Sequence, residues 1–240
     1  LKVRDVGFAG LKDRNAITYQ YIAVKKEINF SIKNVEFEYL GRGKKRIYVG
    51  KLKGNKFEIT IRDIDQKLKA PKEVLNLFGE QRFSEKNDKV GKLIILKKFK
   101  EACELLGLNV DNNDFVGALR KVGREKLRFY IRAYQSYLWN KLAKISKEDI
   151  VFSPGFLTEG DEYDEILKEE GIEKKDFIIR AIPEISSEGS ERDRLVEVED
   201  FKILSFEDDD LNPGKKKEVI SFFLKKGSYA TTVLESLLNN

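Results

Sequence analysis

Apolar and polar residues alternate through the first quarter of the chain, which is typical of β-strands. The alternation changes phase at Lys33 and Asn34, which predicts a turn or bulge there. Residues 41–46 are basic and glycine-rich, which predicts a hairpin turn. Beyond Gly54, the residues Phe57, Ile59 and Ile61 face one side and polar residues face the other, so we expect a sheet with one solvated face. The predicted strands are 16–24, 28–32, 35–39, 47–49 and 56–62.

The hydrophobic period becomes helical from about Pro71. The strongest signal covers residues 124–145, where apolar residues recur at spacings of three and four. Shorter helices are expected at 99–106 and 115–119. The last segments predict a buried strand at 219–224, a turn, and a helix at 229–238 that Ser228 can cap. Residues 153–199 show few strong periods and indicate loops with short elements. The pattern as a whole is α+β, with a mostly helical middle.

Composition limits the chemistry that this chain can perform. Its 240 residues are 41% hydrophobic, which is enough for one large domain or two small ones. No apolar run is long enough to cross a bilayer and no secretory signal is visible, so we expect a cytoplasmic protein. With one cysteine and no histidine, the usual zinc sites and histidine-based triads are excluded. Catalysis must therefore use carboxylates, lysines, tyrosines or hydroxyls.

Charge is distributed unevenly along the chain. Residues 1–60 carry 14 Lys and Arg against 6 Asp and Glu, a net +8, whereas residues 151–210 carry 7 against 20, a net −13. The first region favours contact with a polyanion and the second opposes it. A solvated surface with uneven charge explains the same numbers.

The stretch Gly7–Ala16 places Asp13 in a loop between two cations, Lys12 and Arg14. These neighbours favour the ionised carboxylate, which can act as a base or as a nucleophile. Taken alone, the same pattern also fits a turn-forming aspartate that pairs with its neighbours.

Five segments, in order, resemble the signatures of archaeal-type TruD pseudouridine synthases. In the first motif, a Gly-x-Lys-Asp core is followed by Ala16, Thr18 and Gln20 at fixed offsets. The other four are a second motif (52–62), a third motif (78–87), a motif helix (133–140) and a C-terminal motif (227–234). They extend over nearly the whole chain. The third motif departs from the family at Ser84, where glycine is usual, and the basic residue that approaches the aspartate in the family cannot be named here.

The resemblance implies that Asp13 is the catalytic aspartate. It also implies that Lys12, Asn55 and Phe57 bind the substrate, with Asn55 holding the uracil or the aspartate and Phe57 stacking on the base. Asn55 and Phe57 share parity and can project from one sheet face. Phe57 can equally continue the apolar stripe of Ile59 and Ile61.

The implied reaction breaks the N1–C1′ bond of a uridine, turns the base and rejoins it through C5. Because atoms are conserved, no cofactor and no metal are needed. The implied partner is tRNA, with position 13 favoured as the target, and neither a membrane nor a protein partner is implied. Basic residues can hold phosphates of the RNA while the base is flipped out, although a solvated hairpin explains most of them equally well. The RNA-backbone candidates are Arg14, Arg42, Lys44, Lys45, Arg46 and Arg82, with Lys51 and Lys53 beside them.

The resemblance also implies the pseudouridine-synthase fold, a mixed and largely antiparallel sheet flanked by helices, with a family-specific α/β insertion domain. We expect the catalytic domain at 1–92 and 201–240 and the insertion at about 93–200. Two other functions remain open. A non-catalytic RNA-binding protein of the same fold would be expected to lose Asp13, which is present. A carboxylate-dependent hydrolase would prefer a second carboxylate, and only Asp5 lies close in sequence.

Overall fold

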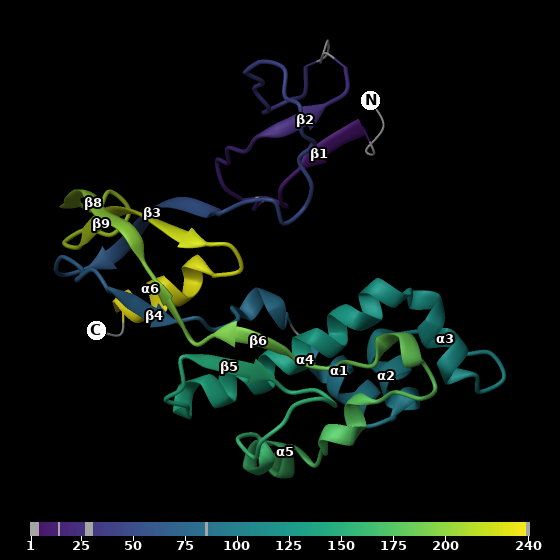
Figure 1. Cartoon of the computed structure of the whole chain (residues 1–240). Coiled ribbons are helices and arrows are strands. Elements are labelled where there is room, and N and C mark those ends of the chain that lie inside the picture. The colour runs from purple at the N-terminus through teal and green to yellow at the C-terminus, as the bar shows by residue number, and fades with distance from the viewer. Residues whose placement is uncertain (1–4, 14, 27–30, 85, 239–240) are drawn as a thin grey trace. The chain divides into compact units, whose positions relative to one another are not determined.

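The computed structural model describes residues 5–13, 15–26, 31–84 and 86–238. The chain divides into two compact units. Unit 1 comprises residues 1–55 and 225–227, and unit 2 comprises residues 56–224 and 228–240. Unit 1 contains a small strand pair, whereas unit 2 contains one sheet-based part and one helical part (Figure 1).

Unit 1 is built on the antiparallel pair β1 (Val6–Phe8) and β2 (Ile22–Val24). Its backbone passes very close to the segment around Ile47. A Cβ on Gly7 would lie only 2.3 Å from the carbonyl oxygen of Ile47, so only glycine fits at position 7. The turn expected at Lys33–Asn34 is confirmed, because Asn34 has a φ of 63° and Val35 N–H donates to Ile32 O.

Several of the strands expected in unit 1 are not formed, and those predictions were wrong. Of 16–24 only Ile22–Val24 is a strand, while 35–39 and 47–49 are irregular and the basic stretch 41–46 joins no strand pair. The apolar side chains of these segments do not pack against a sheet or a core: Ile17 is 88% exposed, Tyr39 76% and Val49 68%. Alternation marks a face that can be buried, but a strand also needs a neighbouring strand to bond to. Of the expected strand 28–32, residues 28–30 lie outside the described residues.

The sheet-based part of unit 2 contains the long strands and the last helix. β3 (Gly54–Ile64), β9 (Lys216–Lys225) and β8 (Glu199–Asp208) form a three-stranded sheet, and β8 pairs with β9 antiparallel. Ile59 and Ile61 of β3 face a hydrophobic core that β9 and α6 (Ala230–Leu238) complete. The alternation expected in β3 and the buried strand expected at 219–224 are confirmed. The final helix begins one residue later than expected.

The helical part of unit 2 is organised around α4 (Arg124–Ile145), which is confirmed with the expected bounds. α2 (Phe99–Leu106) is also confirmed, and α3 (Phe115–Val122) extends three residues beyond the expected end. α1 (Asn87–Ile95) packs so closely on α4 that a Cβ on Gly91 would lie 2.1 Å from the carbonyl oxygen of Tyr130. The large core here includes Trp139, Tyr134 and Phe177, all nearly inaccessible to solvent.

Short elements fill the acidic stretch, as expected. β5 (Ile150–Ser153) pairs with β6 (Ser190–Asp193), and β4 (Glu73–Leu75) pairs with β7 (Leu195–Glu197). The helical structure expected from about Pro71 was wrong at its start, because β4 is a strand. The helix α5 and three short 3-10 helices complete the described elements: α5 (Asp164–Glu170), η2 (Glu80–Arg82), η3 (Lys174–Phe177) and η4 (Pro183–Ile185). These helices and antiparallel pairs confirm the α+β class.

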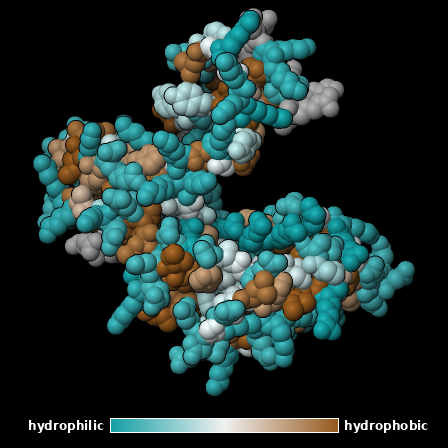
Figure 2. Space-filling model, in the orientation of Figure 1, coloured by the Kyte–Doolittle hydropathy of each residue, from teal (hydrophilic) through white to brown (hydrophobic). Residues whose placement is uncertain are grey.

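Unit 1 exposes many apolar side chains between its basic residues. Tyr19, Tyr21 and Tyr48 are all more than 60% exposed. Figure 2 shows hydrophobic residues, in brown, at the surface among hydrophilic ones in the part that carries β1 and β2. No helix in the described ranges combines the length and the apolar character that a bilayer crossing requires.

Candidate functional site

Asp13 lies in the loop that joins β1 to β2, as the sequence predicted. The register of this strand pair places Phe8 opposite Ile22, so both ends of the connecting loop lie at the same end of the strand pair. Gly50 N–H donates to Ala9 O at 2.7 Å and fixes the start of the loop to the segment that precedes β3. The side chain of Asp13 is exposed, and among the described residues it makes no hydrogen bond and no ion pair. Its neighbour Arg14 lies outside the described residues.

Lys12 connects this loop to the second motif. Its Nζ donates to Oδ1 of Asn55 at 2.8 Å, across 43 residues of sequence. Both residues belong to unit 1, and Asn55 is the second residue of β3. The structure therefore brings together two of the residues that the resemblance assigned to substrate binding, directly beside Asp13 in sequence.

Phe57 follows two residues later on β3 and is partly buried. Its ring stacks on Phe222 of β9, with ring centroids 5.5 Å apart and an angle of 29° between the planes. The ring also packs against the sheet core with Ile59. Phe57 thus continues the apolar stripe of β3, and part of its surface remains accessible.

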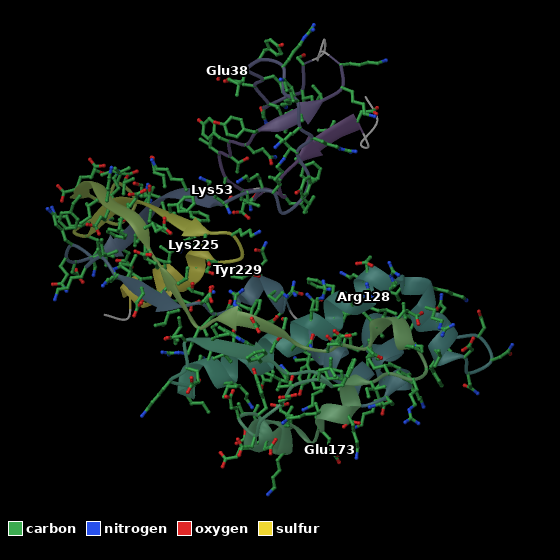
Figure 3. All side chains as sticks on the ribbon, viewed as in Figure 1. Glu38, Lys53, Arg128, Glu173, Lys225 and Tyr229 are labelled. Carbon is green, nitrogen blue, oxygen red and sulfur yellow. The ribbon has the colours of Figure 1, made fainter. Side chains whose placement is uncertain are left out.

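The other three motifs meet in unit 2, around Phe78 of the third motif. Asn140 of the motif helix accepts from Phe78 N–H and donates to Phe78 O, both at 2.9 Å. Trp139 packs edge-on against the Phe78 ring, with centroids 5.5 Å apart. Tyr229 of the C-terminal motif contacts the same ring at 6.3 Å, and Figure 3 labels it just before α6. The contacts therefore form two clusters: the first motif with Asn55 of the second motif in unit 1, and residues of the other three motifs in unit 2.

Arg82 belongs to the second of these clusters, and so does a residue that the sequence did not single out. Arg192 of β6 lies over the Phe78 ring at 4.1 Å and donates to the carbonyl oxygen and Oδ1 of Asn76. Burial lowers the pKa of Arg192 to about 10, which still leaves it charged at neutral pH. No signal in the sequence singled out Arg192, because this residue belongs to none of the five motifs and lies in a stretch that is acidic overall. Phe83, which follows Arg82 in the third motif, is partly buried after η2.

The remaining RNA-backbone candidates of unit 1 are exposed on irregular chain. Arg42, Lys44, Lys45 and Arg46 all lie in the 41–46 stretch and project into solvent. Lys51 donates to the carbonyl oxygen of Arg46 at 3.4 Å and lies 5.3 Å from the centre of the Tyr48 ring.

Two shallow hollows on the helical part lie away from the predicted residues. One, of about 360 Å³, is lined by Asp111, Asp114 and Lys121, and the other, of about 440 Å³, by Lys97, Lys175 and Arg180. Neither includes a residue of the five motifs.

Comparison with known proteins gives a consistent answer. A family model described as tRNA pseudouridine synthase D (TruD) matches residues 1–112 and 151–237. A protein of Methanosarcina acetivorans named "Probable tRNA pseudouridine synthase D" is 27% identical over 356 aligned positions, which cover 97% of this chain and 80% of that protein. A Methanocaldococcus jannaschii protein named "Probable tRNA pseudouridine synthase D 2" is 27% identical, over an alignment that covers 98% of this chain and 79% of that protein.

Among solved structures, the chain is similar to one described as tRNA pseudouridine synthase D from Methanosarcina mazei. The TM-score is 0.78, and the match covers 99% of this chain and 82% of the other at 24% identity, which supports the same fold. Because the family model covers most of the sequence, the chain belongs to the tRNA pseudouridine synthase D (TruD) family.

Proposed function

We propose that this chain isomerises a uridine of tRNA to pseudouridine, with Asp13 as the catalytic carboxylate and position 13 as the target. Family membership supports the reaction and the substrate class. The observation that carries the assignment of the site is the hydrogen bond from Lys12 to Asn55. It joins the first motif to the second beside an exposed carboxylate that no described residue bonds.

Asp13 serves the reaction in its ionised form. The carboxylate either attacks C1′ of the ribose or removes the proton from C2′, and both routes begin with the proton absent from Asp13. Among the described residues the Asp13 carboxylate has no bonded partner, which leaves an oxygen for the ribose. Its neighbour Lys12 bonds to Asn55 instead, which favours a chemical role over that of a turn-forming aspartate paired with Lys12.

The detached uracil must be held while it turns. Asn55 has an amide that can accept from or donate to the base in either orientation, and Lys12 holds that amide in place through its bond to Oδ1. Phe57 stacks on the base with the part of its ring that Phe222 leaves accessible. An aromatic surface permits rotation of the base in its own plane while opposing its escape.

The target nucleotide leaves its stack before reaction, which costs a few kcal/mol. Contacts from Arg14, Arg42, Lys44, Lys45 and Arg46 to RNA phosphates offset this cost. Their position in a region of net positive charge supports this role. Action on tRNA also supports a cytoplasmic location.

We further propose that residues 93–200 are the family-specific insertion in a catalytic domain formed by 1–92 and 201–240. Two observations support this division. The buried residues of the helical part fall between Val90 and Ile185, and the family model leaves residues 113–150 unmatched.

The test replaces the carboxylate and keeps the shape of the side chain. Asp13→Asn is expected to abolish pseudouridine formation in a single-turnover assay on unmodified tRNA and to leave tRNA binding within about twofold. Asp5→Asn is the matched control and is expected to retain activity. Pseudouridine mapped by chemical probing identifies the uridine that is converted.

Each outcome distinguishes the competing functions. Activity in Asp13→Asn contradicts the assignment of the carboxylate. Binding of tRNA by the wild-type chain without any pseudouridine supports the non-catalytic RNA-binding alternative. Release of free base, with loss of activity in both variants, supports a hydrolase that uses two carboxylates.

A further inference from the structure

Arg82 is a charged side chain whose environment does not compensate its charge. Its Nε is buried and makes no hydrogen bond, and its guanidinium has no ion pair among the described residues. Burial lowers the pKa of Arg82, and Arg132 lowers it further by repulsion. A guanidinium stays protonated in proteins, so keeping this charge partly out of water without an ion pair costs free energy.

Aromatic rings hold the guanidinium in place without neutralising it. Cζ of Arg82 lies 5.0 Å from the centre of the Phe129 ring and 5.9 Å from that of Phe78. Cation–π contacts stabilise a cation but satisfy none of its N–H donors. The two terminal nitrogens of Arg82 make no hydrogen bond among the described residues, so their N–H groups remain available to an acceptor from outside the chain.

More positive potential surrounds the same residue. Burial also lowers the pKa of Arg192, and the nearby charge of Arg82 contributes to that lowering, so the two guanidinium groups repel each other. Placing like charges together in a partly buried position is unfavourable unless an anion joins them. The Tyr229 ring packs against the same Phe78 ring over which both arginines lie, with ring centroids 6.3 Å apart.

The first turn of α6 adds hydrogen-bond donors at this place. A Cβ on Gly79 would lie 2.9 Å from Oγ1 of Thr231 and 3.3 Å from the Tyr229 ring, so the segment leading into η2 packs directly on the start of α6. This first turn contains no acidic residue. The N-terminal end of a helix carries partial positive charge and unbonded N–H groups, which favour an anion.

We propose that Arg82, Tyr229 and the first turn of α6 form a binding site for one phosphate of the RNA backbone, with Arg192 adding positive charge. The inference rests on the proposed function, because tRNA supplies the phosphate. A planar guanidinium binds a phosphate through two parallel hydrogen bonds, which a lysine cannot reproduce. The third motif, the motif helix and the C-terminal motif meet here and together position this site.

The test measures tRNA affinity for Arg82→Met over a series of KCl concentrations, by fluorescence anisotropy with an unmodified transcript. Loss of a charge-assisted contact is expected to weaken binding about tenfold at low salt. The slope of log K against log salt is expected to fall in magnitude by about 0.7 to 0.9, the contribution of one phosphate. Arg82→Lys is expected to keep the slope and lose part of the affinity, because the charge remains while the two-pronged bond is lost.

Arg124→Met is the matched control. Arg124 lies on α4 with a side chain 60% exposed and pairs with Glu125 at 3.2 Å. It is expected to leave affinity and slope at wild-type values. Thermal stability distinguishes a binding role from a structural one: Arg82→Met is expected to melt at or above the wild-type temperature, because it removes an uncompensated charge.

The opposite result overturns the inference. If Arg82→Met melts lower while its salt slope is unchanged, Arg82 only braces the rings of Phe78 and Phe129. An unchanged affinity and slope in a stable Arg82→Met also contradicts the phosphate site. If Arg82→Met does not fold, Arg82→Lys provides the test. An Arg82→Lys variant that binds tRNA with wild-type affinity and wild-type salt slope contradicts the two parallel hydrogen bonds. Failure of the proposed function is detected separately, by the Asp13→Asn assay. That assay measures pseudouridine formation and not the salt dependence of tRNA binding.

Discussion

At the scale of single residues, Phe57 combines a structural contact with a proposed catalytic one, and the two can be separated. Phe57 and Phe201 both stack on Phe222, with centroid distances of 5.5 and 6.3 Å. Replacing either ring by leucine keeps an apolar side chain at the same core. If Phe57 also stacks on the uracil, Phe57→Leu loses a contact worth about 1 to 3 kcal/mol. We therefore expect kcat/KM for tRNA to fall roughly 5- to 150-fold in Phe57→Leu.

Phe201→Leu is the control. It is expected to lose about as much free energy of unfolding as Phe57→Leu and to keep a kcat/KM close to that of the wild type. Both variants are compared by urea denaturation and by steady-state kinetics. Equal losses of kcat/KM would show that Phe57 matters only through the core.

Ser84 occupies a backbone conformation that suits glycine. Its φ is 47°, in the left-handed region, where a Cβ costs roughly 1 kcal/mol. The family pattern has glycine at this position, and the geometry gives the physical reason. Ser84→Gly is expected to raise the free energy of unfolding by about 0.5 to 1 kcal/mol, measured by urea denaturation. Ser84→Ala keeps the Cβ and is expected to give no gain, so stabilisation by alanine as well would contradict the explanation.

The residue scale also shows what the sequence could and could not reveal about the site. The motifs placed Asp13 in an exposed loop, and the structure agrees. The bond from Lys12 to Asn55 joins residues that are 43 apart, and no local pattern predicts a contact of that range. Arg192 gave no signal at all, because its role depends on β6 passing beside Phe78, which only the folded chain determines.

At the scale of elements, the long helix α4 was predicted with its bounds, whereas several of the short strands expected in unit 1 were not formed. The apolar spacing of α4 repeats over 22 residues and satisfies its backbone hydrogen bonds within the segment itself. The alternation at 35–39 is as clear over a shorter length, but its strand would need a partner that the local sequence does not specify. Within residues 31–40, which the structure describes, one isolated bridge forms, between Ile32 and Val35.

Glu170 at the end of α5 connects three helices through one carboxylate. It accepts from Lys92 of α1 at 2.6 Å and, on α4, from Lys141 at 2.8 Å, Tyr134 at 3.1 Å and Tyr137 at 3.2 Å. Burial opposes its ionisation, but the bonds from Lys141 and Lys92 outweigh burial and lower the pKa of Glu170 to about 2. The carboxylate therefore stabilises the fold only while it is ionised.

Glu170→Gln is expected to lower the free energy of unfolding by about 2 kcal/mol at pH 7. This is less than the cost of breaking a fully buried ion pair, because both lysines are partly exposed. The pKa in the folded state lies below the ordinary value of 4.5, so this stabilisation is complete above about pH 5 and declines towards pH 2. Urea denaturation across this range should show wild type and variant converging at low pH. Glu169→Gln, 70% exposed and 3.5 Å from Lys141, is the control with little expected effect. A difference that stays constant with pH would contradict the assignment.

At the scale of the whole molecule, burial is distributed unevenly between the units. The two hydrophobic cores consist of residues of unit 2, with fully buried side chains such as Trp139 and Phe222. The described part of unit 1 is joined by the short β1–β2 pair and by isolated bonds such as Gly50 N–H to Ala9 O. Local stability follows buried apolar contacts, so the two units are expected to open with different free energies.

Hydrogen exchange followed by mass spectrometry tests this difference and its link to function. Amides of α4 are expected to exchange roughly a thousandfold or more slowly than those of residues 15–26 and 35–50, because the latter have exposed backbone and few ladder bonds. Addition of unmodified tRNA is expected to slow exchange in the loop of Asp13 and in residues 41–55, where the proposed phosphate and base contacts lie. The loop that joins α2 to α3 contains no residue of the five motifs and is expected to be unaffected. Protection by tRNA in that loop alone would place RNA binding away from Asp13, whereas equal exchange rates in the two units without RNA would contradict the division of stability.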